Sequence, residues 1–184
     1  MISMKLKNKY VKRLSNRKNR GLTLMEVAMV LAIIGIIIAG ALLYFNTANT
    51  SQKITSSLAQ LAQIQQSVRT LYSGQANYSG LTTALIAQSD ALPASMISGS
   101  TISHAFNAGV TVTANTTSST NFDVVFSGLP QDVCKQMLTK DLGRGLVSAG
   151  TTVATQTQPS LPFNLTQATA ACTGTTNAIT WVFN

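Results

Sequence analysis

The stretch Arg20-Gly-Leu-Thr-Leu-Met-Glu26 ends a run of cations and begins apolar sequence that continues to Phe45. Glu26 is the one charged residue in the segment 22–45. As a helix this segment would be about 36 Å long, which is enough to cross a bilayer core of about 30 Å. A carboxylate inside such a segment costs free energy unless it lies near the surface or finds a partner. Glu26 is therefore a candidate functional residue.

The positive charge of the chain is concentrated before this apolar segment. The formal net charge is +8, from 13 Lys and Arg and 5 Asp and Glu. Residues 1–21 carry eight of the cations and no acid, so the sequence after them has no net side-chain charge. This distribution argues against a nucleic-acid-binding surface. By the positive-inside rule it predicts that residues 1–21 are a cytoplasmic leader.

A conventional signal peptide also places a basic segment before an apolar one, so it is an alternative. It would be cut after the apolar region beside small residues, and Ala39-Gly40-Ala41 fits such a site. The apolar segment here is of membrane-spanning length, which is longer than that of a usual signal peptide. We therefore expect the apolar helix to be retained.

Apolar residues continue beyond Phe45 with the periodicity of a helix. They share one helical face and are Ile54, Leu58, Leu61, Ile64, Val68 and Leu71. This spacing predicts one helix over 22–72, about 75 Å long, with a first half that is apolar all round and a second half with one apolar face. Gly74 is the predicted stop. The polar link 46–53 has poor helix propensity, so we expect fraying or bending there.

The remaining sequence predicts a small α+β head. Within 74–108 we expect a short helix over 81–88 in a surface loop, with His104 solvated or capping a turn. Strand patterns follow at 110–114, 122–126, 146–155 and 179–183, and a helix runs from Pro130 to about Gly143, while 156–171 reads mainly as loop. Antiparallel strands with the helix stripe across one face would make a two-layer core.

The two cysteines, Cys134 and Cys172, both follow the apolar segment. If the leader is cytoplasmic, they lie on the oxidising side of the membrane, where disulfides persist. Two cysteines allow one intramolecular pairing. Closing a loop of that length is worth roughly 4 kcal/mol in the chain-entropy model. Two unpaired structural thiols are the alternative.

The N-terminal sequence resembles the processing site of type IV pilins. A basic leader, Gly21, and Leu-Thr-Leu-Met-Glu with a glutamate fifth after the glycine match that site closely over residues 1 to about 50. The long leader, Leu22 in place of Phe, and the widely spaced cysteines resemble the class B (type IVb) major prepilins. One departure is the lack of proline in 22–45, which leaves Gly35 and Gly40 as the weak points of that helix.

The resemblance implies a pathway from membrane protein to filament. A prepilin peptidase would remove the leader 1–21 after Gly21 and methylate the amine of Leu22. The segment 22–45 would span the inner membrane and later form the filament core, and 46–184 would be the globular head. Glu26 would pair with the Leu22 amine of a neighbouring subunit during assembly. The implied partners are identical subunits, the peptidase and the inner-membrane assembly machinery, with an extracellular pilus as the product.

The sequence offers no catalytic constellation, so we expect neither an enzyme nor a cofactor. His104 is the single histidine, and it has no second ligand at metal-binding spacing. The first hypothesis is a structural pilus subunit serving adhesion, aggregation or conjugative contact. The alternatives are a type II secretion pseudopilin, a minor pilin, and a monomeric anchored domain. Pseudopilins commonly lack the disulfide and often carry an acidic calcium site near the C-terminus, whereas no acid follows Asp141 here.

Overall fold

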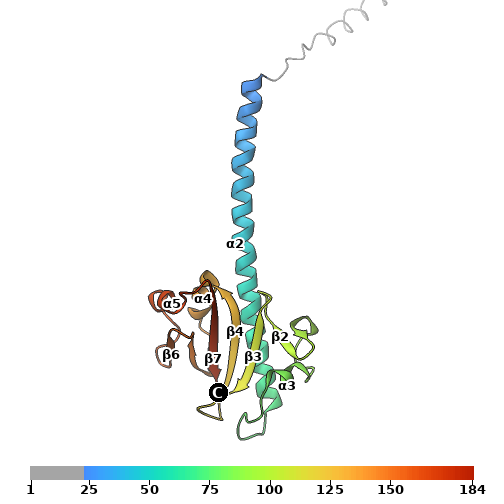
Figure 1. Ribbon diagram of the computed structural model, residues 1–184, viewed down its shortest axis with the longest axis vertical. Helices are drawn as coiled ribbons and strands as arrows, with labels where there is room; N and C mark the ends of the chain where they lie inside the picture. Colours follow the sequence, from blue (N-terminus) through green and yellow to red (C-terminus); the bar gives the residue numbers. More distant parts are fainter. Residues whose placement is uncertain (1–22) are drawn as a thin grey trace, which may run out of the picture. The chain divides into compact units, whose positions relative to one another are not determined.

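The computed structural model describes residues 23–184. These residues fall into two compact units, one ending at Asn46 and the other running from Thr47 to Asn184, which we call the head. The elements, in chain order, are α2 (Leu24–Leu71), α3 (Thr83–Ala87), the 3-10 helix η1 (Ala94–Met96), β1 (Ile97–Ser98), β2 (Thr101–Ser103), β3 (Gly109–Ala114), β4 (Phe122–Pro130), α4 (Gln131–Leu138), β5 (Leu146–Gly150), β6 (Thr155–Thr157), α5 (Leu165–Ala171) and β7 (Thr176–Phe183). Figure 1 shows them on the ribbon.

Helix α2 confirms the predicted long N-terminal helix. It contains 48 residues and continues without a break through the polar link 46–53 and through both Gly35 and Gly40. The expected fraying at 46–53 is therefore absent from this helix. Thr23 caps its start, because the Thr23 hydroxyl oxygen accepts from the backbone N–H of Glu26 at 3.3 Å. Past the other end, Gly74 adopts a φ of +90°, which favours glycine and marks the predicted stop.

The head is built on one antiparallel sheet with the strand order β1-β2-β3-β4-β7-β5-β6. The last described strand, β7, lies between β4 and β5 in the sheet. Figure 1 shows β7 beside β4. Its register places Trp181 opposite Val124 and Ile179 opposite Phe126. The two edge strands have only two and three residues, which limits the unpaired backbone that could join another sheet.

The second half of α2 contributes its apolar face to the same core as the sheet. Ile54, Leu61, Ile64 and Val68 are all buried, as the periodicity predicts. Leu58 is only half-buried and Leu71 is exposed, and the buried Tyr72 continues the face in its place. The predicted two-layer α+β architecture is therefore confirmed.

The strand and helix predictions for the second half of the head hold in part. The face of β4 carrying Phe122, Val124 and Phe126 is buried, and so is the face of α4 that contains Cys134. Helix α4 ends at Leu138, earlier than predicted, and Thr139 is its C-cap. The segment 146–155 divides into β5 and the start of β6, which pair as a hairpin.

Two segments that the sequence assigned to loop are structured. The segment 74–108 contains η1, β1 and β2 besides the expected short helix, which forms as α3. The segment 156–171 contains the end of β6 and α5, which starts with a capping box between Asn164 and Gln167. Strands of two or three residues are too short to show a periodic pattern, and their pairing with a neighbour stabilises them.

Candidate assembly site and the contacts that support the head

The first half of α2 presents an exposed apolar surface, and no other described element of its unit covers it. Every residue from 23 to 47 is exposed. The exposed fraction reaches 74% for Ile36 and 69% for Phe45, values that apolar side chains rarely have in a folded domain. By length and composition this helix could cross a membrane. A surface of this kind requires lipid or other helices around it.

Glu26 lies in the first turn of α2, on that exposed surface. Its position near the helix N-terminus is favourable for a negative charge, because the macrodipole places partial positive charge there. The carboxylate is therefore compatible with the helix while it remains available to another group. Gly21 and Leu22, the two predicted processing residues, lie outside the described residues, so only Glu26 of the predicted assembly pair is described.

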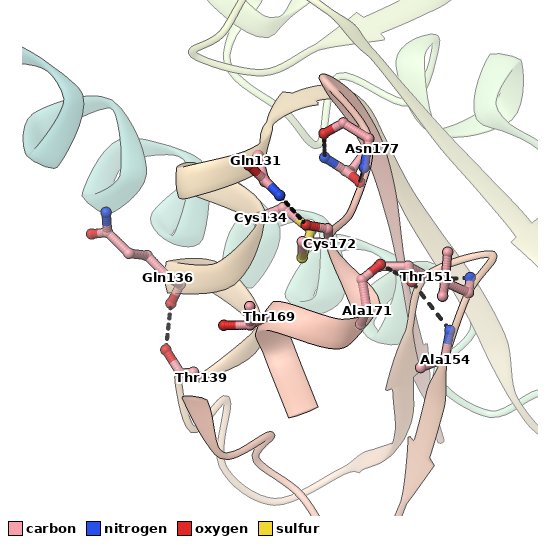
Figure 2. The surroundings of a disulfide bond; sticks show 12 residues. Gln131, Cys134, Gln136, Thr139, Thr151, Ala154, Thr169, Ala171, Cys172 and Asn177 are labelled. Carbon is pink, nitrogen blue, oxygen red and sulfur yellow. Dashed lines mark hydrogen bonds between the residues drawn. A yellow bond between two sulfur atoms is a disulfide. The ribbon is translucent and has the colours of Figure 1, made fainter. Parts of the chain in front are cut away.

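The predicted disulfide between Cys134 and Cys172 is present. Cys134 lies in α4 and Cys172 is the C-cap of α5, with their Cα atoms 6.0 Å apart and 38 positions apart in sequence. Both side chains are fully buried. Figure 2 shows the Gln131 side-chain amide donating to the carbonyl oxygen of Cys172 at 2.8 Å. The disulfide and this hydrogen bond fix α5 against α4, just before the chain enters β7.

A further contact holds the β5–β6 turn to the same place. The hydroxyl of Thr151 donates to the carbonyl oxygen of Ala171 at 2.9 Å. The same hydroxyl oxygen accepts from the backbone N–H groups of Val153 and Ala154 (Figure 2). Residues 151–154 are therefore attached to the disulfide-closed segment as well as to β5 and β6.

The sequence reasoning missed Arg69, which joins the end of α2 to the end of β7. Its Nε and Nη2 atoms donate to the backbone carbonyl oxygen of Asn184 at 3.1 and 2.7 Å. A side chain at Gly145 would collide with the guanidinium group, and Gly145 also has a φ of +96°. Arg69 and Asn184 are 115 positions apart, so no local pattern could have predicted this contact.

His104 takes one of the two roles that the sequence predicts for it, solvated or capping, and not the other. It is not solvated, because its side chain is 3% exposed. Its Nδ1 accepts from the backbone N–H of Phe106, so the capping role is correct. Its Nε2 lies 2.8 Å from the carbonyl oxygen of Ser127. Burial lowers the pKa of His104, and the hydrogen bond to Ser127 opposes that effect.

Among the described residues, the first half of α2 has an exposed apolar surface, whereas the head buries its apolar residues around its own sheet and disulfide. A long helix with a membrane-compatible first half and a second half packed on an antiparallel sheet is the architecture expected from the resemblance to type IV pilins. The Bundlin family model matches residues 46–182, and the model of the prokaryotic N-terminal methylation motif matches residues 16–42. The chain therefore belongs to the Bundlin family.

Individual relatives agree with this assignment. The chain is 26% identical over 189 residues to the major structural subunit of the bundle-forming pilus of Escherichia coli O127:H6, covering 93% of this chain and 98% of that one. It is 28% identical over 148 residues to the toxin coregulated pilin of Vibrio cholerae, covering 76% and 66%. These relatives are pilins, so the pseudopilin alternative is not favoured.

Solved structures agree on the fold. A type IV pilin from Vibrio cholerae El Tor biotype has a TM-score of 0.54 at 16% identity, with 72% of this chain and 99% of that one covered. A type IVb pilin from Salmonella typhi has a TM-score of 0.54 at 21% identity, with 71% and 97% covered.

Proposed function

We propose that this protein is the major structural subunit of a class B type IV pilus and that it polymerises through the first half of α2. The observation that carries the proposal is the contrast in burial along one helix. The whole surface of residues 23–47 is exposed, whereas the head buries its own apolar residues. Before assembly, lipid would cover the apolar half. In the filament, the same half of neighbouring subunits would replace the lipid.

The processing step follows from the N-terminal motif. A peptidase would cut between Gly21 and Leu22 and the new amine would be methylated, in keeping with the match to the N-terminal methylation motif. The removal of residues 1–21 takes away eight cations. Those cations hold the N-terminus on the cytoplasmic side, so their loss removes an electrostatic barrier to extraction of the subunit from the membrane.

Glu26 would set the register of the incoming subunit. Its carboxylate would pair with the Leu22 amine of a neighbour, and each contact would use two different groups on two different subunits. Such a head-to-tail contact continues indefinitely when the rotation does not close a ring, which produces a helical filament. At about 4 Å and an effective dielectric constant near 20, the pair is worth on the order of 4 kcal/mol before desolvation. Desolvation offsets much of this, so the pair contributes register more than strength.

The subunit would travel from the inner membrane to the cell surface. Its partners would be identical subunits, the prepilin peptidase and the inner-membrane assembly machinery. The Thr- and Ser-rich surface of the head would then be displayed along the pilus. Adhesion, aggregation and conjugative contact are the roles that such a surface could serve, through a receptor of unknown identity.

The test is the substitution Glu26→Gln, which keeps the shape of the side chain and removes its charge. We expect the variant to be processed and inserted normally, with Leu22 as its methylated first residue by intact mass. We also expect sheared filaments to fall below detection. Asp132→Asn is the matched control, because Asp132 is an exposed carboxylate on α4 of the head, and it should leave the filament yield unchanged.

Co-expression of wild-type subunits sharpens the test, because each proposed contact uses one Glu26 and one foreign Leu22 amine. We expect partial restoration of filaments that contain the variant. A normal filament yield from Glu26→Gln alone would refute the charge pair and leave apolar packing as the assembly force. A mature N-terminus near residue 42 would refute the processing assignment.

A further inference from the structure

The turn 104–108, which joins β2 to β3, is attached to β4 through the ring of His104. Nε2 of His104 lies 2.8 Å from the carbonyl oxygen of Ser127, and Nδ1 lies 3.2 Å from the backbone nitrogen of Phe106. Within the turn, the backbone N–H of His104 donates to the carbonyl oxygen of Ala108 at 3.1 Å. The backbone at Gly128 approaches closely, since an added Cβ there would lie 2.7 Å from that of Ala108.

The same turn is also attached to α2. The backbone N–H of Ala105 donates to the side-chain oxygen of Gln60 at 3.1 Å, and the Lys53 ammonium lies 5.9 Å from the centroid of the Phe106 ring. The His104 ring is stacked on Phe126, with centroids 4.9 Å apart and planes 1° from parallel. The turn therefore attaches the β2–β3 connection to both β4 and α2.

These hydrogen bonds assign the protonation state of the imidazole. A carbonyl oxygen only accepts, so Nε2 carries a hydrogen and donates to Ser127. A backbone N–H only donates, so Nδ1 is unprotonated and accepts from Phe106. The ring is therefore neutral. A proton added at Nδ1 would set two N–H groups against each other and leave the Phe106 N–H without an acceptor.

The surroundings offer no compensation for a positive charge on this ring. From α2, the neutral Gln60 accepts from the Ala105 N–H and the cation Lys53 lies over the Phe106 ring, so both contact neighbours of His104 in the turn. From β4, Phe126 and Ser127 contact the ring itself. Asp123, the carboxylate of β4, alternates to the opposite face from Phe126 and accepts a hydrogen bond from Asn115 at 2.7 Å. Within residues 23–184, the hydrogen bonds and ring contacts of His104 involve no carboxylate.

We propose that the turn 104–108 is a pH-sensitive latch, which holds the β2–β3 connection on β4 and α2 while His104 is neutral and releases it when Nδ1 is protonated. Release would break the two hydrogen bonds of the ring and expose the apolar face of Phe126. The proton is the ligand of this latch, and its binding opens the head locally in acidic surroundings.

Linkage sets the pH range of the latch. Burial lowers the pKa of His104 in the closed state below the ordinary value of 6.5. The open state then binds more protons, so the stability of the latch is complete above about pH 6.5 and decreases as the pH falls toward the lowered value. One proton changes the closed-to-open ratio by at most about tenfold per pH unit.

The experiment is hydrogen exchange on the full-length protein in detergent from pH 7.5 to 4.5, corrected for the intrinsic exchange rate. We expect protection of the 104–108 amides to decrease by up to about tenfold per pH unit below pH 6.5, while the amides of 122–126 in β4 keep theirs. His104→Gln retains a donor for Ser127 and does not titrate, so it should show no such decrease. Asp123→Asn should retain the wild-type decrease.

The single histidine of the chain gives a second measurement that needs no variant. A 15N-histidine spectrum reports on this ring alone, and we expect the Nε2-protonated neutral tautomer to persist below pH 6.5. Titration at or above 6.5 would overturn the proposal. An equal loss of protection in wild type and His104→Gln would also overturn it. So would the disappearance of the pH-dependent loss in Asp123→Asn. If His104→Gln fails to fold, His104→Asn takes its place.

Discussion

The two halves of α2 have different relations to the rest of the chain, although they form one continuous helix. Ile37 in the first half is 64% exposed, whereas Ile64 in the second half is fully buried. The first half is apolar on all sides, and the second half has one apolar face and one polar face. The sheet of the same chain covers the apolar face of the second half. The apolar surface of the first half must be covered by lipid or by other subunits.

This difference separates the stability of the subunit from its ability to assemble. Substitutions in the head half of α2 should change the free energy of unfolding, because that surface is buried within the chain. Substitutions in the apolar half should leave that free energy unchanged and act on insertion or filament formation. Trp181 is the single tryptophan and is buried in β7, so its fluorescence reports on the head alone.

The largest effect on the head side of this comparison should come from the disulfide. Cys134→Ser removes a crosslink that closes a separation of 38 residues, worth about 4 kcal/mol in the chain-entropy model. Urea denaturation of the full-length protein in detergent, followed by Trp181 fluorescence, would measure this loss. Cys172→Ser should cost about the same, and the double variant should cost no more than either single one. Alkylation of two thiols in the unreduced native protein would contradict the assignment.

A matched pair of isoleucines tests the comparison directly. Ile64→Ala creates a cavity in a fully buried site, so we expect a loss of about 3 kcal/mol of head stability by the same measurement. Ile37→Ala makes the same chemical change in the exposed half and should leave head stability within about 0.5 kcal/mol of wild type. If both variants lose equal stability, the two halves are not energetically separate.

The smallest expected effect is a gain at Ser57. This serine is fully buried on the head half of α2, and its hydroxyl oxygen has no hydrogen-bond partner within the part of the chain that the structure describes. Ser57→Ala removes that unsatisfied group and improves helix propensity, so it should stabilise the head by about 1 kcal/mol. Ser56→Ala is exposed and should show only the propensity gain of about 0.5 kcal/mol. Destabilisation by Ser57→Ala would mean that the hydroxyl has a partner, such as a buried water molecule.

The features that the sequence predicts well are those that produce a local and repeated pattern of residues. The stripe from Ile54 to Val68 repeats often enough to define a buried face. Phe122, Val124 and Phe126 alternate in the same way in β4, and so do Ile179, Trp181 and Phe183 in β7. The disulfide also followed from the sequence, because two cysteines allow a single pairing.

The features missed depend on contacts between distant residues. Strands β1 and β2 are too short to carry a pattern, and they form because each has a neighbour to pair with. Leu71 fits the helical stripe but is exposed, and Tyr72 is buried in its place. Glu26 was identified from its place in a motif. Its proposed partner is the Leu22 amine of another subunit, and residue 22 lies outside the described range.

By itself the sequence determined the long helix and its division into an apolar half and an amphipathic half, and it predicted the cysteine pair. These follow from hydropathy, charge and periodicity, which act over a few neighbouring residues. Only the tertiary structure decided that β7 lies between β4 and β5, that Arg69 binds the end of β7, and that His104 is buried and neutral. The physical reason is that these contacts depend on which surfaces meet when the chain closes on itself, and that choice minimises exposed apolar area and unpaired polar groups over the whole head.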